Sequence, residues 1–315
     1  MSTVIPIKRT YTGAFEAART LGTLMCPPGL SWVTELAPGN ADPAEIILHI
    51  SCNAHFTLFI PYIAQEILKK LNKKFIVFGG PESCCGSIQF NMGDHDLEAK
   101  NAKIALLAFN RVKPSLLVSV CPDCDEVFEK FRLPQTRFEI ANLSELLPRY
   151  LEELKPFLRT VKRKVILHHH TIDSARTADG TNMRLILEAI PGIEIVEAHR
   201  HIGPGIHCQT QKPMPASDQE AMFAEATALG VDTLVVPYHS CYRQHIKMEL
   251  RSPVRVQHYL GIMAESLGID FDEPLKSLRL LGTVDAAMNA LEVQIKAHDL
   301  HTDDVRTYLE RAVFL

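Results

Sequence analysis

Five of the eight cysteines fall at spacings that suit metal binding. Cys52, the adjacent pair Cys84 and Cys85, and then Cys121 and Cys124 follow the pattern C-x31-CC-x35-C-x2-C. In a sequence of cytosolic character, thiols clustered in this way bind metals or take part in redox reactions more often than they form disulfides. The pattern therefore predicts a thiolate-ligated metal centre, and the adjacent pair suits two iron atoms better than one.

The elements that must position these thiols are predicted strands. Residues 45–54, 73–80 and 115–120 are predicted to be buried strands, separated by amphipathic helices over 57–73 and 96–113. A βαβαβ order predicts parallel strands, whose carboxyl ends meet at the edge where open α/β sheets bind ligands. Every cysteine of the pattern follows such a strand, so the five thiols are expected to converge. Five ligands are more than a zinc site or an ordinary cubane cluster uses.

The same order of elements returns in the second half of the chain, after a link at residues 143–160. The predicted strands there are 164–170, 193–199 and 232–239, and the predicted helices are 183–190 and 217–230. IILH at 46–49 matches VILH at 165–168, and LLVSVCPDC at 116–124 matches TLVVPYHSC at 233–241. This internal repeat predicts an α/β protein with two tandem parallel sheets.

The cysteine pattern, completed by Gly86 in the sequence CCG, resembles the cysteine-rich CCG domain of the B-type subunit of heterodisulfide reductase and its relatives. The resemblance covers about residues 45–270. In that family two such domains lie in tandem, and in heterodisulfide reductase each binds a noncubane [4Fe-4S] cluster through five cysteinates. The resemblance implies that one such cluster is held by Cys52, Cys84, Cys85, Cys121 and Cys124.

The second copy departs from the family pattern. His207 and Cys208 stand where the first copy has its CC pair, and the CPDC turn becomes YHSC, which keeps Cys241 with His239 beside it. A second five-cysteine cluster is therefore excluded. Because imidazole and thiolate together suit zinc or an iron centre, a second site for zinc or iron is predicted.

One histidine from the run at 168–170 is expected to complete that site. Strand residues alternate in direction, so His168 and His170 point one way and His169 the other, and which side contributes stays open. Catalytic roles are predicted for His207 and His239. The alternative is a decayed site whose polar residues form hydrogen bonds or line a substrate pocket. The predicted second ligand set is His207, Cys208, His239, Cys241 and His169.

Composition narrows the class of protein. The 315 residues are 46% hydrophobic and 22% charged, and the formal net charge of −4 comes in no long run of one sign, which favours neither nucleic acid nor an anionic membrane as a partner. No stretch approaches the roughly 20 apolar residues that span a bilayer, and we expect a cytoplasmic protein. The expected units are an N-terminal extension (1–44), a first CCG domain (45–155), a second, degenerate CCG domain (156–274) and a helical C-terminal extension (275–315).

The resemblance implies an oxidoreductase subunit that acts on sulfur groups. In the family, this subunit works with a ferredoxin-like iron-sulfur subunit and a flavoprotein. We therefore expect redox chemistry or electron transfer on a thiol, disulfide or persulfide, including the related type that serves sulfur oxidation, with partner subunits required for catalysis.

Two alternatives stay open. The chain could be the iron-sulfur electron-transfer subunit of a flavin-dependent 2-hydroxy acid or succinate-type dehydrogenase. It could also be a zinc-binding scaffold without redox activity, which colour and metal content would reveal, since zinc proteins are colourless.

Overall fold

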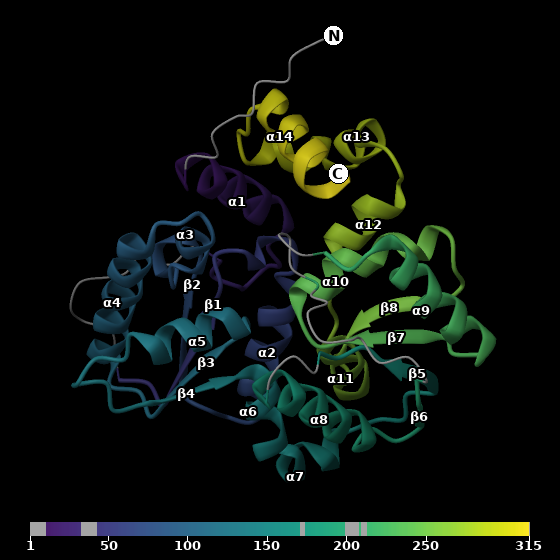
Figure 1. The fold of residues 1–315 in the computed structure, drawn as a ribbon, viewed down its shortest axis with the longest axis horizontal. Coiled ribbons are helices and arrows are strands. Elements are labelled where there is room, and N and C mark those ends of the chain that lie inside the picture. The colour runs from purple at the N-terminus through teal and green to yellow at the C-terminus, as the bar shows by residue number, and fades with distance from the viewer. Residues whose placement is uncertain (1–10, 33–42, 171–173, 199–207, 209–212, 315) are drawn as a thin grey trace.

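The molecule consists of two α/β units side by side, with a group of helices packed over one end (Figure 1). The computed structural model describes residues 11–32, 43–170, 174–198, 208 and 213–314. None of the helices in these ranges has the length and apolar character needed to cross a membrane.

The first unit is built on a parallel four-stranded sheet with the order β2-β1-β3-β4. Its strands are β1 (Ile46–Ile50), β2 (Phe75–Gly79), β3 (Leu116–Ser119) and β4 (Glu139–Asn142). Its helices and turns are η1 (Ala54–Phe56), α2 (Phe59–Lys70), η2 (Pro81–Ser83), α3 (Ser87–Asn91), α4 (His95–Val112), α5 (Pro122–Lys130), α6 (Leu143–Arg149), α7 (Leu151–Leu154) and η3 (Lys155–Phe157).

Both faces of this sheet are covered, which explains why its central strands are continuous apolar runs. Every residue of β1 and β3 is buried. Ile47 packs in one apolar cluster with α4 and α5, whereas Leu48 packs in another with α2. The period-2 alternation of strand side chains thus divides the unit into two cores.

The second unit repeats this plan with the sheet order β6-β5-β7-β8, again parallel. Its strands are β5 (Arg163–Leu167), β6 (Ile193–Val196), β7 (Thr233–Val236) and β8 (Arg255–His258). Its helices and turns are α8 (Ser174–Glu188), α9 (Ala216–Ala228), α10 (His239–His245), η4 (Ile246–Leu250) and α11 (Tyr259–Leu267). The predicted α/β fold with two parallel sheets related as a repeat is confirmed.

The structure adds one strand to each predicted βαβαβ unit. β4 and β8 are four-residue edge strands with the sequences EIAN and RVQH. Such short strands mix polar and apolar residues and lack the apolar run that marks a central strand. The pattern that revealed the inner strands therefore did not reveal these two.

A helical cap brings the two ends of the described chain together. It contains α1 (Tyr11–Met25), α12 (Pro274–Leu280), α13 (Val284–Ala297), α14 (Thr302–Leu309) and the π-helical turn η5 (Glu310–Phe314). α1 contacts both α13 and α14. The predicted helical extension over 275–315 contains α12, α13 and α14, with a break between α13 and α14 where Asp299 adopts a left-handed φ of 51°.

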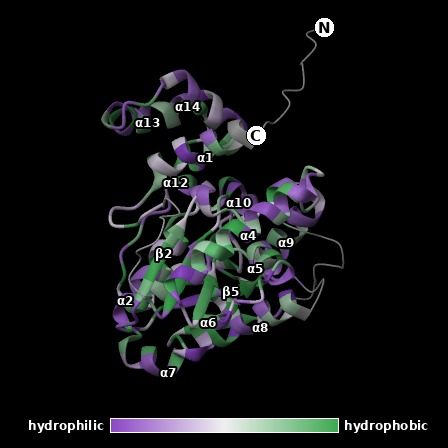
Figure 2. Ribbon diagram, turned by 90° about the vertical axis from the view of Figure 1, so that its left-hand side faces the viewer, coloured by the Kyte–Doolittle hydropathy of each residue, from purple (hydrophilic) through white to green (hydrophobic). Residues whose placement is uncertain are grey.

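The two units are joined by both apolar and polar contacts. α2 packs on α11, and the Phe59 ring lies 5.1 Å from the ring of Tyr242. Figure 2 shows the strands largely in the hydrophobic colour and mixed colours along the surrounding helices. Buried Asp179 in α8 accepts hydrogen bonds from Ser144 in α6 and from Tyr238 after β7. These contacts fix the carboxyl ends of the two sheets toward each other.

Candidate metal and redox site

The five cysteines of the first unit all lie beyond the carboxyl ends of its strands. Cys52 follows β1, Cys84 and Cys85 follow β2 through the turn η2, and Cys121 and Cys124 follow β3 into α5. All five are buried, with at most 8% of their surface exposed. The edge of the sheet thus gathers soft sulfur donors in a largely buried site.

The sulfur atoms form a chain of neighbours. The Sγ atoms of Cys52 and Cys84 lie 3.3 Å apart, and hydrogen bonds link Cys84 to Cys85, Cys85 to Cys124, and Cys124 to Cys121. Five sulfur ligands in a row extend over a larger distance than the coordination sphere of a single ion. The arrangement therefore fits a polynuclear iron-sulfur group, whose preferred protein ligands are cysteine thiolates.

Gly86 explains why the cysteine pair needs a glycine after it. Its φ is 100°, and a Cβ built there would lie 2.6 Å from the Cα of Glu98. Only glycine adopts this conformation against a neighbouring backbone without strain. Its N–H also donates a hydrogen bond to the Cys84 Sγ at 3.4 Å. The third residue of CCG therefore both turns the chain and contacts the sulfur.

Buried histidine His49 supports the same loop from the sheet. Its Nε2 lies 2.9 Å from the carbonyl oxygen of Ser83, the residue before the cysteine pair. The ring packs edge-on against Phe109 and Phe128. Burial lowers the pKa of His49. A neutral imidazole hydrogen-bonded to the loop holds Cys84 in place.

Helix α5 contributes its amino-terminal end to the site. Cys121 is the N-cap residue, Pro122 begins the helix and Cys124 lies in the first turn. Unpaired N–H groups and the positive end of the helix dipole stabilise thiolates at such positions. The hydrogen bond with Cys124, helped by one with His239, holds the pKa of Cys121 well below its usual value, although burial opposes this. Cys121 therefore favours the deprotonated form that binds metal.

A second group of donors lies beyond the strands of the second sheet. His168 and His170 follow β5, Cys208 follows β6, and Cys241 lies in the first turn of α10 after β7. All four are buried, and their ligand atoms lie within 4.8 Å of one another. The Nε2–Sγ distance is 3.2 Å both from His168 to Cys208 and from His170 to Cys241.

The sequence-predicted ligands of this second site are only partly brought together. Cys208 and Cys241 meet, but they are joined by His168 and His170 in place of His169 and His239. His169 lies on the other side, against Gly180 of α8. His207 lies outside the described residues. Residues 168–170 alternate in direction as predicted. His168 and His170 lie on the face toward Cys208 and Cys241.

His239 points across to the first unit. It hydrogen-bonds with the Cys121 thiol and lines the pocket described below. It is the first residue of α10, which also carries Cys241. His239 therefore stands between the two groups of donors.

His245 is a buried histidine that the sequence pattern did not single out. It is fully buried, and its Nε2 lies 3.4 Å from the Cys208 Sγ. Burial, aided by nearby His168, lowers its pKa well below the usual value. A signal was available, because His245 stands four residues after Cys241 and therefore on the same helix face.

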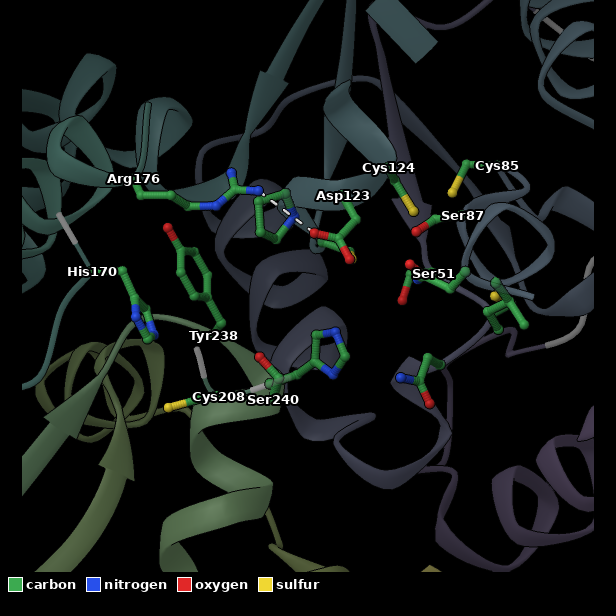
Figure 3. Close-up of a pocket in the computed structure, with 17 residues that line it drawn as sticks. Ser51, Cys85, Ser87, Asp123, Cys124, His170, Arg176, Cys208, Tyr238 and Ser240 are labelled. Atoms are coloured by element: carbon green, nitrogen blue, oxygen red, sulfur yellow. Dashed lines mark ion pairs between the residues drawn. The ribbon is translucent and has the colours of Figure 1, made fainter. Parts of the chain in front are cut away.

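A pocket of about 130 Å³ separates the two groups. Figure 3 shows Cys85 and Cys124 on one side of it and His170, Cys208 and Tyr238 on the other. Donor groups from both halves of the repeat thus border one cavity.

An ion pair spans this pocket between the units. The Arg176 Nη2 lies 2.7 Å from the Glu126 Oε1 and 3.5 Å from the Asp123 Oδ1. The contact with Asp123 is the dashed line in Figure 3. Desolvation and the neighbouring Cys121 sulfur raise the pKa of Asp123 to about 7, against the lowering effect of Arg176. The rim of the pocket therefore offers a guanidinium and a carboxyl beside the thiols.

Comparison with known proteins agrees with this geometry. Residues 46–129, which contain all five cysteines of the first group, match the family model "Cysteine-rich domain" (CCG). The chain is 23% identical over 249 residues to the D-type subunit of the dihydromethanophenazine:CoB–CoM heterodisulfide reductase of Methanosarcina barkeri, covering 72% of this chain and 60% of that protein. The matched region thus spans less than two thirds of the length of that relative.

Two further proteins are similar. An uncharacterized iron-sulfur protein of Methanocaldococcus jannaschii is 24% identical over 59% of this chain and 37% of its own length. The solved structure of an aspartate racemase homologue from Pyrococcus horikoshii is 14% identical, covers 71% of this chain and 97% of that one, and gives a TM-score of only 0.32. The matching cysteine-rich domain and the similarity to an iron-sulfur protein agree with the buried thiols. Residues 46–129 form a CCG cysteine-rich domain, and the chain is similar to a heterodisulfide reductase subunit.

Proposed function

We propose that this protein is an iron-sulfur subunit of a heterodisulfide reductase-like complex and acts on a thiol, disulfide or persulfide. The observation that carries the proposal is the set of five buried cysteine thiols in contact with one another, four of which line a pocket between the two units. Similarity to one subunit of a heterodisulfide reductase supports the same function.

The cofactor in this proposal is one noncubane [4Fe-4S] cluster. Its ligands are Cys52, Cys84, Cys85, Cys121 and Cys124. Five soft donors are one more than a cubane cluster takes, and the adjacent pair can serve two irons. When bound, such a cluster supplies and accepts single electrons beside the pocket.

The residues of this chain then bind the sulfur substrate and move protons. Reductive cleavage of a disulfide consumes two electrons and two protons and releases two thiols. The electrons come from the partner subunits, which we propose to be a ferredoxin-like iron-sulfur protein and a flavoprotein. His239, in contact with Cys121 and facing the pocket, is placed to donate a proton to the leaving sulfur.

Arg176 and Asp123 serve in orientation. Their ion pair lies at the pocket, so an anionic substrate group could approach the guanidinium. A role for His207 as a second catalytic histidine stays a prediction, and so does the assignment to the sulfur-oxidation type.

The proposal also covers the domain division and location. We propose an N-terminal extension (1–44), a CCG domain (45–155), a degenerate CCG domain (156–274) and a helical extension (275–315), in line with the two sheets and the helical cap. We also propose a cytoplasmic location, a compartment that keeps cysteine thiols reduced.

The test follows cluster oxidation by a disulfide. Anaerobically prepared protein is reduced chemically, the reductant is removed, and the visible absorption is followed after a small mixed disulfide is added. We expect oxidation of the wild-type cluster, with one disulfide consumed per two chains because each cluster supplies one electron, and in His239→Asn a retained cluster that is oxidised about 100-fold more slowly. Cys26→Ala, which changes a half-buried thiol bonded to the Leu30 carbonyl oxygen, is the matched control.

Two results would contradict the proposal. Protein with zinc but no iron or sulfide would be the zinc-binding scaffold without redox activity. An iron protein whose cluster reacts with a quinone analogue but with no disulfide or persulfide would be an electron-transfer subunit of the dehydrogenase type.

A further inference from the structure

We propose that His168, His170, Cys208 and Cys241 bind a single zinc ion in a closed, four-ligand site. This site is separate from the five-cysteine group and does not depend on the function proposed above. The four ligands come from the segments that follow three successive strands of the second sheet, β5, β6 and β7.

The distances suit one tetrahedral ion. All four ligand atoms lie within 4.8 Å of one another, and two Nε2–Sγ pairs are 3.2 Å apart. With Zn–S of about 2.3 Å and Zn–N of about 2.0 Å, the N–S edge of a tetrahedron is about 3.5 Å. The two Nε2–Sγ edges of 3.2 Å differ from this by a few tenths of an ångström, and side-chain rotation can bring the remaining ligand atoms, all within 4.8 Å of one another, onto one ion.

The types of ligand atom indicate which metal binds. Two thiolates with two imidazoles in a compact tetrahedron are typical of structural zinc, whereas calcium and magnesium require oxygen ligands. A binuclear cluster with two cysteine and two histidine ligands would hold them further apart, because two irons lie between the pairs. Here each histidine instead touches a cysteine.

His245 completes the site as a positioning residue. The Gln219 Nε2 donates to the Gln244 carbonyl oxygen at 3.0 Å and approaches the His245 Nδ1 at 2.8 Å. Because the amide nitrogen faces it, the Nδ1 of His245 accepts, and the proton lies on Nε2. That N–H points at the Cys208 Sγ, 3.4 Å away. His245 therefore donates to the bound thiolate and is not itself a ligand.

The site has a consequence for the pocket. Cys241 lies two residues after His239 in the first turn of α10. A metal held by Cys241 fixes this turn relative to the segments after β5 and β6. It thereby holds His239 beside Cys121 of the other unit.

The experiment measures zinc and cobalt binding by the full-length protein. After chelation and dialysis, protein is titrated with Co²⁺, and then with Zn²⁺ in competition. We expect about one Co²⁺ per chain, with the intense visible bands of tetrahedral coordination and a near-ultraviolet thiolate charge-transfer band, displaced by one equivalent of Zn²⁺.

Variants assign the ligands. Cys241→Ser and His170→Asn are expected to lose at least 100-fold in zinc affinity, while His245→Gln should lose about 10-fold to 100-fold with the cobalt spectrum kept tetrahedral. His169→Asn, on the opposite face of the same segment, is the matched control and should bind zinc like the wild type. Cys85→Ala should also keep its zinc.

If a ligand variant fails to fold, the cobalt spectrum of the wild type and the zinc affinity of His245→Gln still test the proposal. Weak, octahedral cobalt bands in the wild type would overturn the proposal. The proposal would also be wrong if zinc affinity survived in both Cys241→Ser and His170→Asn but fell in His169→Asn. Iron bound in place of zinc at these ligands would overturn it as well.

Discussion

The two halves of the molecule share one strand order and differ in the donor atoms that follow the strands. His49 and His168 occupy matching positions, since the β1–β3 register aligns Ile46 with Leu116 and the β5–β7 register aligns Val165 with Thr233. Yet His49 bonds the Ser83 carbonyl oxygen, and His168 contacts the Cys208 sulfur. The two halves share one backbone arrangement, and a few side chains determine which metal group can bind at the carboxyl edge of each sheet.

One cysteine position that both halves keep lies in the first helical turn after the third strand. Cys124 and Cys241 both lie there and are buried. In the first half its neighbours are thiols, and in the second they include His168 and His170. In our two proposals, imidazoles in place of thiols on the same backbone plan give a single-ion site where the other half has a polynuclear one.

The largest expected effect comes from breaking the first half alone. In Cys85→Ala, iron and sulfide should fall from about four each to well below one per chain, because the central thiol of the chain of contacts is lost. Zinc should stay at about one. Elemental analysis of anaerobic protein measures both, and Cys26→Ala should resemble the wild type. Equal loss of iron in Cys85→Ala and Cys241→Ala would remove the separation between the halves.

The next effect concerns the glycine that the second half lacks, where Gln209 follows Cys208. Gly86→Ala should lower the free energy of unfolding by about 2 to 4 kcal/mol, through a strained φ and a clash with the Glu98 backbone. Gly93→Ala is the control, because Gly93 also has positive φ but nothing lies within 4 Å of an added Cβ; we expect about 1 kcal/mol. Urea unfolding measures both, and equal losses would refute the role of the close contact.

The contact between the halves is tested at Asp179. Asp179→Ala leaves the buried hydroxyls of Ser144 and Tyr238 without their acceptor, and should cost about 2 to 3 kcal/mol of unfolding free energy. Ser144→Ala, which removes one donor, should cost about 1 kcal/mol. Thermal or urea unfolding gives the values. If the two variants were equally stable, the carboxylate would not be a joint acceptor.

The smallest effect separates the two matching histidines. His49→Leu leaves the Ser83 carbonyl oxygen unpaired and should cost about 1 to 2 kcal/mol, with the zinc content unchanged. His168→Leu should instead lose zinc. Metal analysis of the two variants compares them directly, and zinc loss in His49→Leu would contradict the assignment.

Much of the fold could be predicted because its inner strands are strong patterns. The continuous apolar runs before Cys52 and Cys121 marked buried parallel strands, and parallel strands imply a common edge. The edge strands β4 and β8 could not be found in this way, since four mixed residues give no period. The break at Asp299 rests on one residue with positive φ, which the amphipathic pattern does not reveal.

The second site was harder to predict because it depends on tertiary packing. Sequence alternation placed His168 and His170 on one face, but only the fold shows that this face meets Cys208. The contact of His239 with Cys121 depends on how two separate sheets pack. No local pattern contains that information.

Metal analysis of the intact protein tests the central claim, that one repeat holds a cluster and the other a single ion. Iron, acid-labile sulfide and zinc are measured per chain on anaerobically prepared protein. We predict about four iron, four sulfide and one zinc. About eight iron without zinc, or zinc without sulfide, would contradict this claim.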